Sequence, residues 1–232
     1  MSLDKTKCDP ELGLRVREYL ISKGVETPHE ANYLNVDNKT KILQIEKHMS
    51  EVLKILGYDL SDDSLEETPN RIAKMQVLDM NWGMKPEYFP KCTTVDNKMS
   101  YDEMVIERGV SIISQCEHHM AIIDGKATIA YIPNKKVLGL SKINRIAEYF
   151  SRRFQIQERL TEQIYHSLSY ILETEHIAVM IDAAHYCVRA RGVEDMNSRT
   201  VTSRLGGTFK EQGSNARAEF LAIANQSISR IG

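Results

Sequence analysis

Two short stretches of the chain combine cysteine and histidine at spacings that suit a metal ion. The first reads Cys-Glu-His-His from Cys116 to His119, and the second reads His-Tyr-Cys from His185 to Cys187. Thiolate and imidazole groups are the ligands that zinc prefers in proteins. The two stretches together therefore predict a metal site, with zinc as the ion.

The geometry of a β-strand limits how these residues can share one ion. Residues two apart lie on the same face of a strand, so His185 and Cys187 would flank one site. Residues three apart point to opposite faces, so Cys116 and His119 can share an ion only across a bend. A break in the strand pattern at this point would supply that bend. In a straight strand, His118 would face the same side as Cys116 instead.

Spacing alone leaves open whether such a site is catalytic or structural. Two cysteines and one histidine supply three ligands, and three protein ligands plus water is the catalytic pattern for zinc. A structural site would close its fourth position, for which His118 or His185 is available. The other two cysteines, Cys8 and Cys92, have no such neighbours and are predicted to be buried small hydrophobes.

A cluster of cations marks the start of one predicted helix. Ser141, expected at the cap of this helix, is followed by Lys142 and Arg145 in the first turn. Cations there oppose the helix dipole, but with the free backbone N–H groups they form a good binding site for phosphate. The sequence has neither a P-loop nor a dinucleotide-binding glycine fingerprint. Further cations available to a phosphate site are Arg71, Lys74, Arg189 and Arg191.

Composition and charge restrict the class of protein. The 232 residues are 42% hydrophobic and 27% charged, which is the balance of a soluble globular protein. A formal net charge of -2 argues against general nucleic-acid binding, which needs a basic excess. No apolar run approaches the roughly eighteen residues of a membrane span. With no apolar signal segment at the amino terminus and only four cysteines, a cytoplasmic location is expected.

Helical periodicity dominates the first part of the chain, and strand patterns dominate the rest. Helices are predicted over 10–24, 37–56 and 68–82, the last capped by Thr68, and 27–33 is predicted to be a linker. Strands are predicted over 103–115, 119–132, 176–188 and 198–209, with helices over 141–150, 157–172 and 216–228. This segregation predicts an α+β fold with an antiparallel sheet. We expect a helical N-terminal region, 1–90, and a catalytic domain, 91–232.

Several long motifs occur in one order and together resemble the GTP cyclohydrolase I family. They are Thr-Pro-Asn-Arg-Ile-Ala-Lys from Thr68, Cys-Glu-His-His from Cys116, Asp-Gly-Lys-Ala from Asp124, Gly-Leu-Ser-Lys-Ile-Asn-Arg from Gly139, Gln-Glu-Arg-Leu-Thr from Gln157 and His-Tyr-Cys-Val-Arg-Ala-Arg-Gly from His185. The resemblance implies the tunnelling fold, with helices on one face of the sheet and with strands from several subunits closing a barrel. It also implies a homodecamer of two face-to-face pentamers.

The resemblance implies hydrolytic opening of the guanine imidazole ring of GTP at C8, with release of formate. An Amadori rearrangement of the ribose and ring closure would then give 7,8-dihydroneopterin triphosphate. Zinc is implied on Cys116, His119 and Cys187, and proton transfer on His118, His185 and Ser141. The implied substrate contacts are Gln157 and Glu158 for guanine, and Lys142, Arg145, Arg191, Arg71 and Lys74 for the triphosphate, the last two from a neighbouring chain.

Two other functions fit parts of the pattern. One is a different tunnelling-fold pterin enzyme, such as a relative of pyruvoyltetrahydropterin synthase, but the His-x-Cys pair at His185 argues against it. The other is a zinc-containing regulator that binds a nucleotide without turnover. Intact His118, His185 and Ser141 beside the expected ligands argue against an inactive descendant of this kind.

Overall fold

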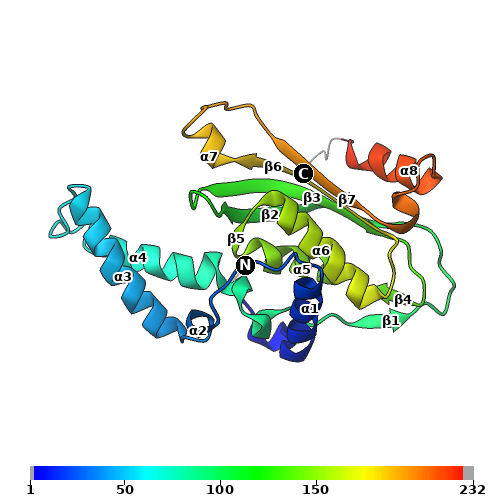
Figure 1. The fold of residues 1–232 in the computed structure, drawn as a ribbon, viewed down its shortest axis with the longest axis horizontal. Helices are drawn as coiled ribbons and strands as arrows, with labels where there is room; N and C mark the ends of the chain where they lie inside the picture. Colours follow the sequence, from blue (N-terminus) through cyan, green and yellow to red (C-terminus); the bar gives the residue numbers. More distant parts are fainter. Residues whose placement is uncertain (1–2, 227–232) are drawn as a thin grey trace.

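The fold is built on one curved, five-stranded sheet (Figure 1). The computed structural model describes residues 3–226. The strands are β2 (Val105–Cys116), β3 (Ile122–Tyr131), β5 (Phe154–Gln155), β6 (Ile177–His185) and β7 (Thr200–Leu205), in the order β5-β2-β3-β6-β7. All neighbours are antiparallel except β5, which pairs in parallel with the end of β2. A separate small sheet pairs β1 (Thr94–Asp96) with β4 (Lys136–Leu138). The predicted α+β class is confirmed.

Two helices, α5 (Leu140–Ser151) and α6 (Gln157–Leu172), pack on one face of the sheet, and α1 (Pro10–Ser22) packs against α6 (Figure 1). This layer encloses the main core, to which Ile129 and Ile164 contribute fully buried side chains. The opposite face carries α8 (Asn215–Ala224), held by a smaller apolar cluster. The predicted last helix, 216–228, overlaps α8, which ends at Ala224, and residues 227 and 228 lie outside the described range.

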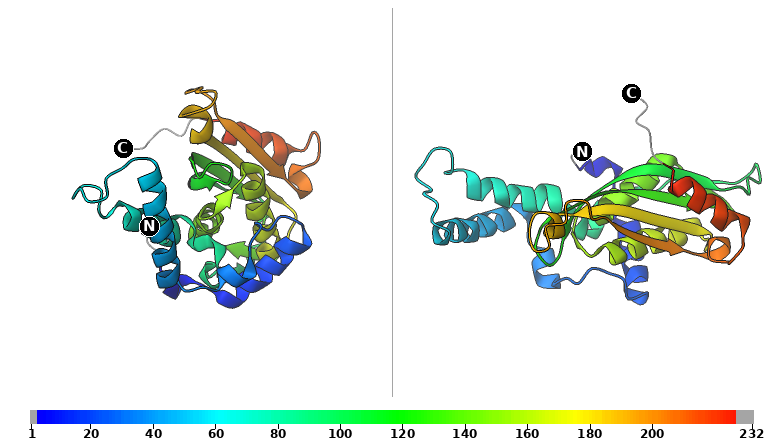
Figure 2. Two further views of the ribbon diagram at one scale, coloured as in Figure 1. Left: turned by 60° about the vertical axis from the view of Figure 1, so that its left-hand side comes forward. Right: turned by 90° about the horizontal axis from the view of Figure 1, so that it is seen from above.

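A helical arm projects away from the sheet (Figure 2). It consists of α3 (Asn38–Ile55) and α4 (Thr68–Lys74), which pack against each other. The predicted helix 68–82 changes geometry along its length, since a π-helical segment (Met75–Met80) and a 3-10 turn (Trp82–Met84) follow α4. The predicted linker contains the short helix α2 (Ala31–Leu34). Among the described helices, none combines the length and the apolar character that crossing a membrane requires.

Both predicted serine or threonine caps were wrong by one or two positions. Helix α5 begins at Leu140 with extended Gly139 as its cap, so Ser141 lies inside the first turn. Helix α4 begins at Thr68 itself, and Glu67 precedes it without a side-chain cap bond. The hydroxyl of Ser141 is exposed on the surface of the first turn, where a ligand can reach it.

Candidate metal centre and active site

A tight turn between β2 and β3 brings Cys116 and His119 to the same side. The N–H of Cys116 donates to the carbonyl of Ala121 at 2.8 Å, and the carbonyl of Cys116 accepts from the N–H of Met120 at 2.9 Å. Met120 takes a left-handed conformation with φ of 55°, which reverses the chain direction. The bend that the Cys-x-x-His spacing requires is therefore present.

The third residue of the group, Cys187, reaches the same place from the end of β6. The β3–β6 register pairs Ile123 with His185, which sets the end of β6 beside the β2–β3 turn. The predicted strand 176–188 stops at His185, and the one-turn helix α7 (Tyr186–Arg189) carries Cys187. The ligand atoms of Cys116, His119 and Cys187 all lie within 4.8 Å of one another. Within residues 3–226 they form the one group of three such side chains that can hold a metal.

The chemistry of this group fits zinc. Zinc bonds of about 2.3 Å to sulfur and about 2.0 Å to nitrogen put tetrahedral ligand atoms between about 3 and 4 Å apart, so small side-chain movements would complete the site. Burial and the neighbouring Cys116 raise the pKa of the Cys187 thiol. A cation bound here would favour the thiolate form of Cys187, which its surroundings otherwise disfavour. Cys116 is buried and His119 is exposed, which leaves one side of the group open to a fourth ligand.

His118 lies beside the metal group. Its Nδ1 is 3.7 Å from the sulfur of Cys116, and its side chain is 64% exposed. The same-face argument for a straight strand does not apply to His118, because the chain has already turned after Cys116. His119 therefore completes the group of three, and His118 stays at its solvent-facing edge.

An ion pair ties the turn to the start of α6. Arg159 donates to both carboxylate oxygens of Glu117, at 2.7 and 3.4 Å, and these hydrogen bonds lower the pKa of Glu117. The N–H of Glu117 also donates to the carbonyl of Gln155 at 3.1 Å. Sequence reasoning missed this pair, because its partners are 42 positions apart and neither has a local pattern that indicates the other.

The side chain of His185 is held by Gln157, the first residue of α6. Its Nε2 lies 2.8 Å from the Oε1 of Gln157, whose side chain is almost fully buried. Burial lowers the pKa of His185, and the nearby carboxylate of Glu158 partly opposes this effect. The structure thus gathers His185, Gln157 and Glu158 next to the element that carries Cys187.

A family model for GTP cyclohydrolase I matches residues 45–225. The chain belongs to this family. Among the curated relatives, the GTP cyclohydrolase 1 of Edwardsiella ictaluri is 54% identical over 92% of this chain and 96% of its own length. The GTP cyclohydrolase 1 of Klebsiella pneumoniae subsp. pneumoniae is 52% identical over 89% of this chain and 92% of its own. The resemblance stated from the motifs is confirmed.

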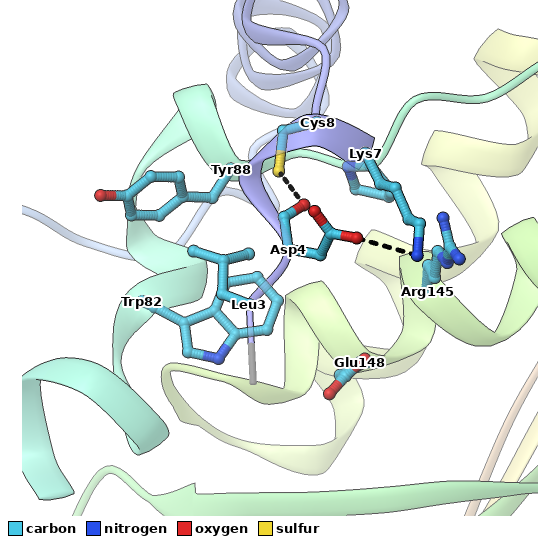
Figure 3. A pocket seen from close by; sticks show the side chains of 9 residues that line it. Leu3, Asp4, Lys7, Cys8, Trp82, Tyr88, Arg145 and Glu148 are labelled. Atoms are coloured by element: carbon cyan, nitrogen blue, oxygen red, sulfur yellow. Dashed lines mark hydrogen bonds and ion pairs between the residues drawn. The ribbon is translucent and has the colours of Figure 1, made fainter. Parts of the chain in front are cut away.

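The cations that the family resemblance assigns to phosphate fall into two groups. Lys142 and Arg145 lie one turn apart on α5, and Arg145 lines a cavity of about 70 Å³ beside Asp4 and Lys7 (Figure 3). Asp4 and Lys7 form an ion pair at 2.8 Å, so the charge of Lys7 is already partly neutralised.

The other group lies on different elements. Arg71 and Lys74 are exposed on α4, in the helical arm, and Arg191 is exposed in the loop after α7. The base of the arm reaches the metal turn through a cavity of about 430 Å³, lined by Ile72, Met120 and Phe154 among others. Within one chain these cations therefore lie on three different elements, α5, α4 and the loop after α7.

Proposed function

We propose that this chain is a zinc-dependent GTP cyclohydrolase I that opens the guanine imidazole ring of GTP at C8. The products would be formate and, after ribose rearrangement and ring closure, 7,8-dihydroneopterin triphosphate. The observation that carries the proposal is the convergence of Cys116, His119 and Cys187 next to His185, in a chain that belongs to this family. Membership supports GTP as the substrate.

Cys116, His119 and Cys187 would hold the zinc ion. When bound, zinc supplies a Lewis acid that lowers the pKa of water toward neutrality, which makes hydrolysis at C8 accessible near neutral pH. The open side of the group supports a catalytic site over a structural one, because a closed site would have a fourth protein ligand.

The chain's own side chains would bind the base and move the protons. Glu158 is exposed in the first turn of α6, and one carboxylate can accept both the N1–H and the exocyclic amine of guanine. His185 would protonate the imidazole nitrogen next to C8, and His118 and Ser141 would move protons during ribose opening and rearrangement. The side-chain amide of Gln157 already has partners within the chain, so we assign guanine recognition chiefly to Glu158.

The triphosphate would be bound by cations from more than one chain. Lys142, Arg145 and Arg191 would come from the protomer that holds the metal. Arg71 and Lys74 would come from a neighbour, which the exposed position of both on a projecting arm supports. This arrangement requires the homo-oligomer implied by the family, a decamer of two pentamers whose sheets close into the tunnelling-fold barrel. Five cations on a tetra-anionic substrate are compatible with a net charge of -2, because the substrate compensates them locally.

One assay tests the proposed activity. The zinc-loaded protein is incubated with GTP, and formate and the dihydropterin chromophore are followed together, before and after chelation of the metal. We expect both products in equal amounts, and neither after chelation. Zinc-loaded protein that yields no formate would overturn the enzyme in favour of a non-catalytic zinc-containing regulator. Full activity in metal-free protein would overturn the zinc mechanism.

A further inference from the structure

Only one orientation of the Gln157 side-chain amide satisfies the hydrogen-bond acceptors around it. Its Nε2 lies 3.0 Å from the carbonyl oxygen of Ile181, 2.9 Å from that of Thr200 and 3.1 Å from the hydroxyl of Thr202. Backbone carbonyls can only accept hydrogen bonds, so the NH2 group must face them. A flipped amide would place its oxygen against two carbonyl oxygens in a buried site, which is strongly unfavourable.

Two threonines reinforce this orientation. The hydroxyl of Thr161 donates to the main-chain carbonyl of Gln157 at 2.9 Å, so its oxygen is left to accept from the hydroxyl of Thr202 at 2.7 Å. The oxygen of Thr202 then accepts from the amide of Gln157. Every donor in this set of hydrogen bonds has an acceptor, and the direction of each bond is determined. The Oε1 of Gln157 therefore faces His185 as an acceptor only.

This orientation determines the state of the His185 ring. An amide oxygen cannot donate, so the ring nitrogen 2.8 Å away, Nε2, must carry the hydrogen. In the neutral ring the other nitrogen, Nδ1, then has the free lone pair. Within residues 3–226, the structure gives Nδ1 no hydrogen-bond partner.

We propose that Gln157 is a positioning residue that keeps His185 in the Nε2–H tautomer, which leaves the lone pair of Nδ1 as the ring site available to the substrate. The inference rests on the proposed function only in giving His185 a proton to transfer. It changes the part expected of Gln157, because the side chain acts through His185 instead of on the guanine edge. The buried position of Gln157, 1% exposed, agrees with an indirect part.

Neutron crystallography of the zinc-loaded protein above neutral pH tests the tautomer directly. We expect deuterium on Nε2 of His185 and none on Nδ1. Deuterium on Nδ1 alone, or an amide of Gln157 with its ND2 group toward His185, would overturn the proposal. The neutron measurement does not depend on turnover. A failure of the proposed function would show instead as absence of formate in the activity assay, so the two failures can be told apart.

A pair of variants tests the consequence for turnover. Gln157→Leu removes the acceptor, and we expect kcat to fall by about 10- to 100-fold with little change in KM for GTP, as for other groups that orient a reacting side chain. Gln163→Leu is the matched control. Gln163 is also a buried amide on α6, but it bonds Gln155, Val25 and Thr27 instead of His185. The control should lose stability and keep kcat within about twofold.

The separate changes in kcat and KM distinguish the two roles considered for Gln157, orientation of His185 and direct binding of guanine. A higher KM with unchanged kcat in Gln157→Leu would mean that this side chain binds guanine directly, which overturns the proposal. Equal losses of kcat in the two variants would mean that α6 stability alone is responsible, which also overturns it. If Gln157→Leu does not fold, the neutron measurement on the unaltered protein still decides the tautomer.

Discussion

The two ends of the candidate site are held together by different forces. At the metal end, Cys116, His119 and Cys187 come from the end of β2, the turn after it and a one-turn helix, and His119 is exposed. At the other end, the amide of Gln157 is buried and satisfied by acceptors from β6 and β7 and by His185. On the proposed function the first end would gain its cohesion from a bound cation, whereas the hydrogen bonds of the second are complete without any ligand.

This difference indicates a division of work. Preorganised groups are worth most where they need no rearrangement during the reaction, which suits the proton-transferring end. An open metal end lets the ion keep a position for water and substrate. If the comparison is right, changes at the metal end should remove the ion, and changes at the buried end should leave the ion in place and alter turnover.

Loss of a metal ligand should have the largest effect. Cys187→Ser replaces a thiolate by a hydroxyl, which is a poor zinc ligand, so we expect loss of bound zinc and a fall in formate release of at least about 10³-fold. Zinc content is measured by elemental analysis of the purified variant beside the activity. Cys92→Ser is the control, since Cys92 is a free cysteine outside the metal group. Full zinc content in Cys187→Ser would remove Cys187 from the ligand set.

Removal of the imidazole at the buried end should cost almost as much activity but no metal. His185→Ala deletes the group proposed to transfer the proton, for which general acid–base catalysis typically contributes about 10²- to 10⁴-fold. We expect a loss of kcat in this range with full zinc content. Zinc lost in parallel with activity would contradict the division between the two ends, because it would make His185 part of the metal end.

The ion pair between the two ends should have an intermediate effect. Arg159→Ala leaves Glu117 without its bidentate partner, and we expect zinc affinity or kcat to fall by about 10- to 100-fold. Arg159→Lys should recover only part of the loss, because an ammonium cannot form the fork. Arg199→Ala, which breaks a surface pair with Asp182, is the control and should leave both quantities nearly unchanged. Equal behaviour of Arg159→Ala and Arg199→Ala would show that the ends are not linked through this pair.

Much of this arrangement was predictable from sequence, because the signals are local. Helix α6 was predicted with the bounds that the structure has, because its apolar positions recur at helical spacing. The break after Cys116 was predicted from the strand pattern, and the spacing of Cys116 and His119 required a bend at the same place. The short strand β5, which pairs with the end of β2, was not predicted, because two residues give no detectable periodicity.

The contacts that orient the site were not predictable in the same way. Gln157 was assigned to guanine because a family motif contains it, and nothing in its neighbours reveals that Thr200 and Thr202 lie opposite its amide. The early end of β6 was also missed, since Tyr186 and Val188 have strand-like propensity while the structure forms α7 there. Burial and long-range register decide these features, and local patterns do not report them.

The smallest effect should come from Thr202, the outermost residue of the hydrogen bonds that hold the amide of Gln157. Thr202→Val removes one of three acceptors for the amide of Gln157 and leaves the carbonyls of Ile181 and Thr200. Two carbonyls are enough to fix the amide, so the tautomer of His185 should be unchanged and kcat should fall by less than about threefold. The lost hydrogen bonds should lower the free energy of unfolding by about 1 kcal/mol, read from chemical denaturation. A loss of kcat as large as that of Gln157→Leu would mean that the hydroxyls of Thr161 and Thr202, and not the sheet carbonyls, fix the amide of Gln157. The rigidity of this end of the site would then have to be assigned to those two threonines.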